Sequence, residues 1–503
     1  MNALYQSLPT WLQELLPILL LLVVIGAVIL RLPKIDLGHS DAFRRRRVMN
    51  WLPLGLTYAF LYMGRYNLTV SKRAFGDLLQ DGEPLMTHQD FATIFFWGTL
   101  TYGSSFVFNG PLTDRFGGKK AILTGAGGSA TMNLLMGLVT ISILNDGPMH
   151  EWLAANLTLT FSVLYALNMY FQSFGAVAIV KTNAPWFHVR ERGVFGAIFG
   201  VLISLGIYFA FDLGGKVLDA LGLQWVFLVP TILLGVFLLI DVVLVRNTPG
   251  EAGYEDFDTA DASSGDEGPR LGVLEVFKLM FRNPVIVTIA FIEFCSGFLR
   301  QAIMQWFQIF GKQTDEVLQL KSSFVFENWG MLLCCAGILG GTLAGIISDR
   351  VFDSRRGPVA ALLYVAMLVS AIALIFLYTT PLVGWMVIFM SMAVIGVHGM
   401  LSGTASMDFG GKKNVGVAVG IIDGFVYMGT AVMALTYGVL LPSDAEPELA
   451  GDPANWISWP IAMVPVALIG VLLAARVWNA KPQPKKPKPA IVTAGEGDEP
   501  ATF

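Results

Sequence analysis

A succession of long apolar stretches is the feature that most constrains how this chain can fold. A transmembrane helix needs roughly 20 mainly apolar residues to cross about 30 Å of hydrocarbon. Thirteen stretches meet that requirement, and they are centred on Leu20, Tyr62, Leu100, Asn133, Val163, Leu202, Leu233, Gly297, Gly337, Met367, Met392, Val426 and Val464. Only 14% of the 503 residues are charged, against about 25% in a soluble domain. The sequence therefore predicts an all-α polytopic membrane protein.

Lysine and arginine residues gather in alternate loops between these stretches. They lie at Arg44 to Arg47, Arg115/Lys119/Lys120, Arg190/Arg192, Arg350/Arg355/Arg356, Lys412/Lys413 and in the tail from Lys481. Cytoplasmic loops carry an excess of such residues. The Lys72–Asp90 and Gly311–Lys321 loops also contain some, so the pattern is a bias. It predicts an N-terminus outside the cell and a C-terminus in the cytoplasm.

Changes in composition divide the chain into five expected parts. These are an extra N-terminal transmembrane helix over 10–32, six-helix bundles over 48–246 and 284–479, an acidic cytoplasmic linker over 247–283, and a disordered cytoplasmic tail over 480–503. The linker interleaves acidic residues with Gly, Ser and Ala, which is typical of a solvated segment. The first stretch could instead be a signal peptide. It lacks a positive n-region and a clear cleavage site before Arg31, which favours an uncleaved helix.

The two bundles share a repeated marker. The segments Gly110–Arg115 and Gly345–Arg350 both read G-x-x-x-D-R, and basic residues follow each of them. An arginine precedes the marker aspartate by 49 residues in both halves, at Arg65 and at Arg300. Parallel halves related by an axis along the membrane normal would place these two arginines opposite each other.

Arg65 and Arg300 are expected deep in the membrane, where an arginine costs about 2.5–3.5 kcal/mol on insertion scales. Two facing arginines also repel each other, so an anion between them would explain the pair, because guanidinium groups match phosphate or carboxylate oxygens two at a time. Tyr58 and Tyr62 share one helix face with Arg65. The alternative is a structural pairing of the arginines with buried acids such as Glu293 and Asp423, which are also inside predicted spans.

The sequence gives little support for metal, disulfide, nucleotide or enzymatic chemistry. The three cysteines lie inside apolar runs and the five histidines show no metal-ligand spacing, which argues against a disulfide framework, a zinc site or another metal. Gly117-Gly-Lys-Lys lacks the hydroxyl residue and upstream glycine of a phosphate-binding loop. We expect no cofactor, no enzymatic activity and no nucleic-acid partner.

Several motifs resemble one known family. The G-x-x-x-D-R-x-G-G-K-K loop resembles the signature of the major facilitator superfamily, and the whole core resembles the organophosphate:phosphate antiporter family, which includes glycerol-3-phosphate and hexose-6-phosphate transporters. The stretches that carry this resemblance are Tyr58–Asn67, Phe171-Gln172 through Trp186-Phe187 to Glu191-Arg192-Gly193, Leu299-Arg300 with Trp306, and Ile395–His398 through Lys412-Lys413 to Gly424–Tyr427. The resemblance implies the major facilitator fold of two six-helix bundles, here with one extra N-terminal helix.

The resemblance also implies a function. Arg65 and Arg300 match the arginines that bind phosphate in the family, and Asp114 matches the aspartate of a cytoplasmic latch, for which Arg115, Asp349 and Arg350 are further candidates. The other candidate substrate-binding residues are Tyr58, Tyr62, Gln301, Gln305, Trp306, His398 and Tyr427. The expected activity is alternating-access uptake of a small phosphorylated metabolite in exchange for inorganic phosphate, by a monomer in the bacterial inner membrane.

Some positions depart from the glycerol-3-phosphate carrier. Phe106, Ile203 and Gln305 stand where that carrier has a lysine, a histidine and an aspartate, which argues against glycerol-3-phosphate itself as the substrate. Glu293 and Asp423 are additional acids, so they are coupling candidates for a proton-coupled carrier of another organic anion. A membrane sensor of sugar phosphates that does not transport is a third possibility.

Overall fold

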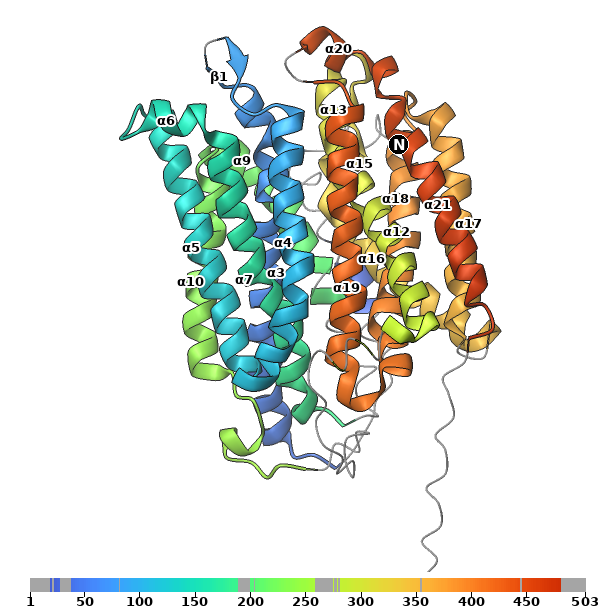
Figure 1. Ribbon diagram of the computed structural model, residues 1–503. Coiled ribbons are helices and arrows are strands. Elements are labelled where there is room, and N and C mark those ends of the chain that lie inside the picture. Colours follow the sequence, from blue (N-terminus) through green and yellow to red (C-terminus); the bar gives the residue numbers. More distant parts are fainter. Residues whose placement is uncertain are drawn as a thin grey trace, which may run out of the picture.

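A computed structural model of the chain describes residues 19, 22–27, 38–80, 82–188, 200–202, 204–257, 275, 278, 281–352, 355–443 and 446–480. These residues are almost entirely helical, which confirms the all-α prediction (Figure 1). The described strands are β1 (Leu79–Gln80) and β2 (Glu83–Pro84), a short antiparallel hairpin. Most of the predicted extra helix over 10–32, most of the predicted linker and the tail from 481 lie outside the described residues.

The N-terminal half is a bundle of long helices, coloured blue to green in Figure 1. Its elements are α3 (Asp41–Gly76), α4 (His88–Phe116), α5 (Gly118–Leu144), α6 (His150–Ala155), α7 (Leu157–Asn183), η1 (Ala184–Trp186), the π-helical η3 (Phe209–Leu213), α9 (Gly214–Leu221) and α10 (Trp225–Leu244). The short η4 (Gly250–Ala252) follows α10. Within the half, α4 packs against α7, α7 against α5, and α10 against α3 and α5.

The C-terminal half is a second bundle, coloured yellow to red. Its elements are α12 (Pro284–Met304), α13 (Trp306–Gln313), α14 (Asp315–Leu318), η5 (Leu320–Ser322), α15 (Phe324–Glu327), α16 (Trp329–Val351), α17 (Arg356–Leu377), α18 (Val383–His398), the π-helical η6 (Gly399–Ala405), α19 (Ser406–Leu440), α20 (Pro447–Gly451), η7 (Pro453–Trp456) and α21 (Ser458–Arg476). The helix α12 packs against α19 and α21, and α16 packs against α18.

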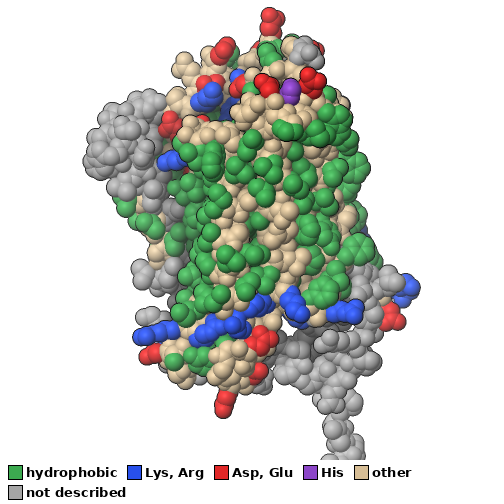
Figure 2. Space-filling view, turned by 90° about the vertical axis from the view of Figure 1, so that its left-hand side faces the viewer, with side chains coloured by type: hydrophobic (Ala, Val, Ile, Leu, Met, Phe, Trp, Pro, Cys, Tyr) green, Lys and Arg blue, Asp and Glu red, His purple; other side chains and the backbone are tan. Residues whose placement is uncertain are grey.

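The surface of the molecule matches a bilayer. Ten helical segments of the described chain are long and apolar enough to cross a membrane. The helices α3 and α4, of 36 and 29 residues, contain more polar residues and complete a core of twelve. Figure 2 shows a broad hydrophobic band bordered at one rim by Lys and Arg side chains. We call the rim where α3 begins and α4 ends the basic end, and the opposite rim the distal end.

Local sequence explains where the two leading helices begin. Ser40 caps α3 by accepting a hydrogen bond from the Phe43 amide, so this helix begins at Asp41. In α12 the cap is Asn283, and Pro284 occupies the first helical position, where a missing N–H costs nothing. Both caps satisfy amides that a helix leaves unpaired.

Glycines bring the two halves into backbone contact along α4 and α19, which lie side by side in Figure 1. A Cβ atom built on Gly103 would lie 2.9 Å from the carbonyl oxygen of Gly424, and one built on Gly424 would lie 3.2 Å from the carbonyl oxygen of Gly103. The two helices therefore touch where neither has a side chain. Such close approach is common where small residues line the interface of membrane helices.

Two adjacent glycines of α16 provide a test of this packing. A Cβ at Gly340 would collide with the backbone of Met392 on α18, whereas one at Gly341 meets nothing within 4 Å. We expect Gly340→Ala to destabilise the protein by about 1–3 kcal/mol, since overpacking forces helices apart. Gly341→Ala is the matched control and should not lower the thermal unfolding midpoint of the purified protein. Equal midpoints for the two variants would contradict the predicted contact between α16 and α18.

Candidate functional site

Arg65 lies on α3 in the middle of the protein, 2% exposed. Its Nε donates to Oε1 of Gln172 at 3.0 Å. One terminal nitrogen donates to the Tyr102 hydroxyl at 2.8 Å, and the other donates to the Tyr427 hydroxyl at 3.1 Å. Tyr427 belongs to the other half, so this arginine joins α3, α4 and α7 to α19. A guanidinium has five N–H donors, which leaves donors of Arg65 for a ligand.

A buried polar network holds Gln172 in place behind Arg65. Gln172 donates to Asn168 at 3.2 Å, and Asn168 also accepts from Asn133 and Ser129 at 3.1 and 2.6 Å. Asn168 donates in turn to the carbonyl of Gly64 at 2.7 Å. The network ties α5 and α7 to the backbone beside Arg65. A connected buried network of this kind fixes one arrangement of its members, so the orientation of Arg65 is set in advance of any ligand.

Arg300 lies on α12 and is close to the same tyrosine. Its guanidinium carbon is 5.8 Å from the centre of the Tyr427 ring, and that of Arg65 is 6.0 Å from it. The structure thus brings the two predicted arginines to one aromatic ring. The buried Nε of Arg300 has no hydrogen-bond partner among the described residues. Arg65 is anchored by protein groups, whereas Arg300 has donors in reserve.

An acidic and histidine-containing group lies beside Arg300. Oε2 of Glu293, a fully buried residue, is 2.8 Å from Nδ1 of His398. Asp423 accepts a hydrogen bond from Ser402 at 2.5 Å and interacts electrostatically with His398, Glu293 and Arg300. The coupling candidates and His398, which were identified separately in the sequence, therefore form one cluster in the C-terminal half.

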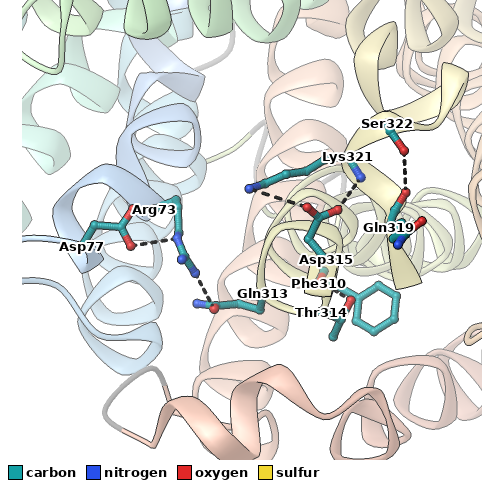
Figure 3. A network of polar contacts seen from close by, with 9 residues as sticks. All are labelled: Arg73, Asp77, Phe310, Gln313, Thr314, Asp315, Gln319, Lys321 and Ser322. Carbon is teal, nitrogen blue, oxygen red and sulfur yellow. Dashed lines mark hydrogen bonds and ion pairs between the residues drawn. The ribbon is translucent and has the colours of Figure 1, made fainter. Parts of the chain in front are cut away.

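The two halves are joined by a ladder of hydrogen bonds between the arginines and the distal end. Gln301 donates to the Tyr66 hydroxyl at 3.1 Å, Thr69 donates to Gln305, and Arg73 donates to Gln313 at 2.7 Å. Figure 3 shows the last rung, with Arg73 of α3 reaching to the end of α13. The ladder closes the central site toward the distal end.

A second contact closes the same end on the other side of the bundle. Asp212 in η3 accepts hydrogen bonds from the amides of Gly330 and Met331 at 2.6 and 2.8 Å. These amides belong to the first turn of α16, in the other half. A carboxylate at a helix N-terminus satisfies unpaired amides and the positive end of the helix dipole.

The remaining predicted residues lie in different places. Tyr58 and Tyr62 are buried and their rings pack edge to face at 5.5 Å, and Arg65 lies 4.6 Å from the Tyr62 ring centre. Trp306 lies apart from the arginines, in an aromatic cluster with His88, Phe91 and Tyr437. The side chains of Asp114, Asp349 and Arg350 lie outside the described part of the structure, while Arg115 is exposed at the basic end.

Sequence reasoning missed Tyr102 and Gln172, which accept hydrogen bonds from Arg65, and Tyr66, which accepts one from Gln301. Tyr66 directly follows Arg65, and Gln172 lies in a stretch that carries the family resemblance, so both could have been found. Tyr102 lies in an apolar span with no local signal. It is identified only when α3 and α4 are packed together.

Comparisons with known proteins give a matching family and several relatives of this chain. The family model of the Major Facilitator Superfamily matches residues 54–434. The chain is 25% identical to the glycerol-3-phosphate transporter of Bacillus subtilis, covering 88% of this chain and 95% of that protein. It is 24% identical to the membrane sensor protein UhpC of Escherichia coli, with coverage of 89% and 95%. A probable hexose phosphate transport protein of Chlamydia muridarum is 23% identical, with coverage of 76% and 81%.

Solved structures support the fold. A bacterial homologue of the human lysosomal transporter Spinster, in an inward-facing and unoccupied conformation, superposes with a TM-score of 0.61 at 16% identity. The match covers 88% of this chain and 98% of that one. The predicted fold is therefore confirmed for the twelve-helix core, and the relatives come from the family that the sequence motifs resemble.

If the contact of Asp212 with α16 keeps the distal end closed, its loss should make that end more accessible to a labelling reagent. Asp212→Asn removes the charge and weakens two hydrogen bonds, each worth about 1.5–3 kcal/mol when one partner is charged. We expect about tenfold faster reaction of a maleimide with a cysteine introduced at Ile309, which lines a small distal pocket between the halves. The native cysteines are buried and give a low background.

Asp146 provides the control for this measurement. Its side chain is 88% exposed in the distal turn after α5, so Asp146→Asn removes a charge from the same end without breaking a contact between the halves. Labelling of the Ile309→Cys protein should be unchanged by Asp146→Asn. Equal labelling rates with Asp212→Asn would exclude Asp212 as a distal closure.

Proposed function

Because the chain belongs to the Major Facilitator Superfamily, we propose that it is a secondary transporter that moves a small phosphorylated metabolite in exchange for inorganic phosphate. The observation that carries the proposal is the pair of arginines, one from each half, that both lie within about 6 Å of the Tyr427 ring centre. Relatives named as glycerol-3-phosphate and hexose phosphate transporters support the choice of a phosphorylated substrate.

The arginine pair suits phosphate for electrostatic reasons. Two guanidinium groups in a water-poor interior repel each other strongly, and a dianion between them removes that repulsion. Each can bind two phosphate oxygens in parallel. Bound phosphate also completes the hydrogen bonding of Arg300, whose Nε is buried without a partner in the described structure. The free energy of the empty site therefore favours occupation by an anion.

The position of the site between the halves supports alternating access. Phosphate contacts both halves, and rocking of one half against the other would expose it to each side in turn. The distal ladder and Asp212 hold one side closed. An anion that neutralises both arginines lowers the cost of bringing the halves together, so exchange is faster than the return of an empty carrier.

We further propose a monomer in a bacterial inner membrane with the basic end in the cytoplasm. Arg44 to Arg47 at the start of α3 are consistent with the positive-inside rule. In this orientation the distal ladder closes the periplasmic side. The predicted latch residues Asp114, Arg115, Asp349 and Arg350 would then lie at the cytoplasmic end, since α4 and α16 end there.

A sensor is the second candidate function. The similarity to the membrane sensor protein UhpC extends over 89% of this chain, and binding without transport requires the same arginine pair. The Glu293–His398 pair similarly favours a proton-coupled carrier of another organic anion as an alternative to phosphate exchange. Flux measurements distinguish the three.

Uptake of radiolabelled phosphate into proteoliposomes preloaded with phosphate tests the proposal. We expect exchange to fall at least about a hundredfold in Arg65→Gln and in Arg300→Gln, because loss of one buried charge pair costs several kcal/mol. Arg476→Gln, at the exposed end of α21, is the matched control and should retain exchange.

Two results would change the assignment. Full exchange by Arg300→Gln would remove the arginine clamp from the mechanism. Absence of exchange by the folded wild-type protein would favour the sensor if phosphate esters still bind, and the proton-coupled carrier if an imposed pH gradient drives uptake of an organic anion.

A further inference from the structure

One face of α12 carries three buried polar atoms that lack a hydrogen-bond partner in the described structure. They are Oε1 of Glu293, Oγ of Ser296 and Nε of Arg300. The three residues are spaced i, i+3 and i+7 and so lie on one stripe of the helix. Buried polar atoms are nearly always paired. Such atoms also occur elsewhere in the described structure, but these three share one row beside the arginine clamp, which favours a ligand that supplies the missing partners.

The two ends of this row differ in their hydrogen-bonding chemistry. Arg300 at one end only donates hydrogen bonds, and the carboxylate of Glu293 at the other end only accepts them. The two Cα atoms are about 10 Å apart along the axis at 1.5 Å per residue, and both side chains are long enough to approach each other. A matching ligand therefore carries an anion at one end and a donor a few atoms away.

The charges around Glu293 identify that donor. Glu293 and Arg300 face the cluster from α12, His398 faces it from α18, and Asp423 and Tyr427 face it from α19. A phosphate dianion balances the two arginines. His398 contributes at most one positive charge, so when Glu293 and Asp423 are both ionised at least one negative charge is uncompensated. Buried uncompensated charge is costly, and a hydroxyl donor would leave it in place. An ammonium group would cancel it.

We propose that the substrate is a zwitterion: a short phosphate monoester that carries a primary ammonium group. This inference rests on the proposed function, which places the phosphate between Arg65 and Arg300. The ammonium group lies against Glu293 and Asp423, and Ser296 contacts the chain between the two ends. Glycerol-3-phosphate lacks the cation that the cluster requires.

Ligand-induced stabilisation of the purified protein tests the proposal without any flux. Thermal unfolding is followed against increasing concentrations of 2-aminoethyl phosphate or ethyl phosphate at neutral pH; the two esters differ only in the ammonium group. We expect 2-aminoethyl phosphate to half-saturate the protein at a concentration about tenfold lower or less. Equal half-saturation by the two esters would overturn the proposal, as would a match between glycerol-3-phosphate and the amino ester.

Substitutions locate the ammonium group. Glu293→Gln and Asp423→Asn keep the shape of each side chain and remove its charge, and each should reduce the preference for the amino ester to about threefold or less. The preference is a ratio within one protein, so a general change in affinity does not affect it. An undiminished preference in both variants would overturn the proposed site. If a variant does not fold, the comparison of the two esters with the wild-type protein still tests the proposal.

The result is independent of the test of phosphate exchange. Preference for the amino ester without flux in vesicles would leave this inference intact while transport fails. Exchange of phosphate with no preference between the two esters would support transport and overturn the proposal of a zwitterionic substrate.

Discussion

The compensation of the buried Arg65 charge organises the centre of this protein. A guanidinium removed from water needs partners for its donors and for its charge. Gln172 and Tyr102 provide them within the N-terminal half, and Tyr427 provides one from the C-terminal half. Because the partners come from three other helices, the relative positions of α3, α4, α7 and α19 are all linked to one side chain. In the described structure Nε of Arg300 has no hydrogen-bond partner, so this arginine has a donor available for a ligand that enters the site.

Much of the fold could be predicted from the sequence because the bilayer imposes a simple pattern on it. Apolar length predicts the spans, and the equal spacing of Arg65 and Arg300 from their marker aspartates predicts that the arginines come together. The roles of individual side chains were harder to predict from the sequence. Trp306 is next to polar residues in the sequence, yet it packs among aromatic side chains near the distal end. The partner Tyr102 depends on the rotation of α4, which no local pattern specifies.

The hydrogen bonds between the halves differ in their energetics from the network inside the N-terminal half. The distal rung between Gln301 and Tyr66 joins neutral side chains and contributes about 0.5–1.5 kcal/mol net, and the rung between Arg73 and Gln313 has one charged partner and contributes about 1.5–3 kcal/mol. Such contacts can be made and broken in each cycle. The central network around Asn168 is buried within one half and has no access to water. It keeps the shape of the binding surface while the halves move.

The contact between Gly103 and Gly424 has a mechanical consequence. Both glycines lie near the middle of their helices, so the backbones of α4 and α19 meet at mid-depth with no side chains to interlock. A joint of this kind acts as a fulcrum: tilting one half by a few degrees separates the helices at one face of the membrane and presses them together at the other. Little has to repack at the two glycines themselves, because their backbones meet there directly.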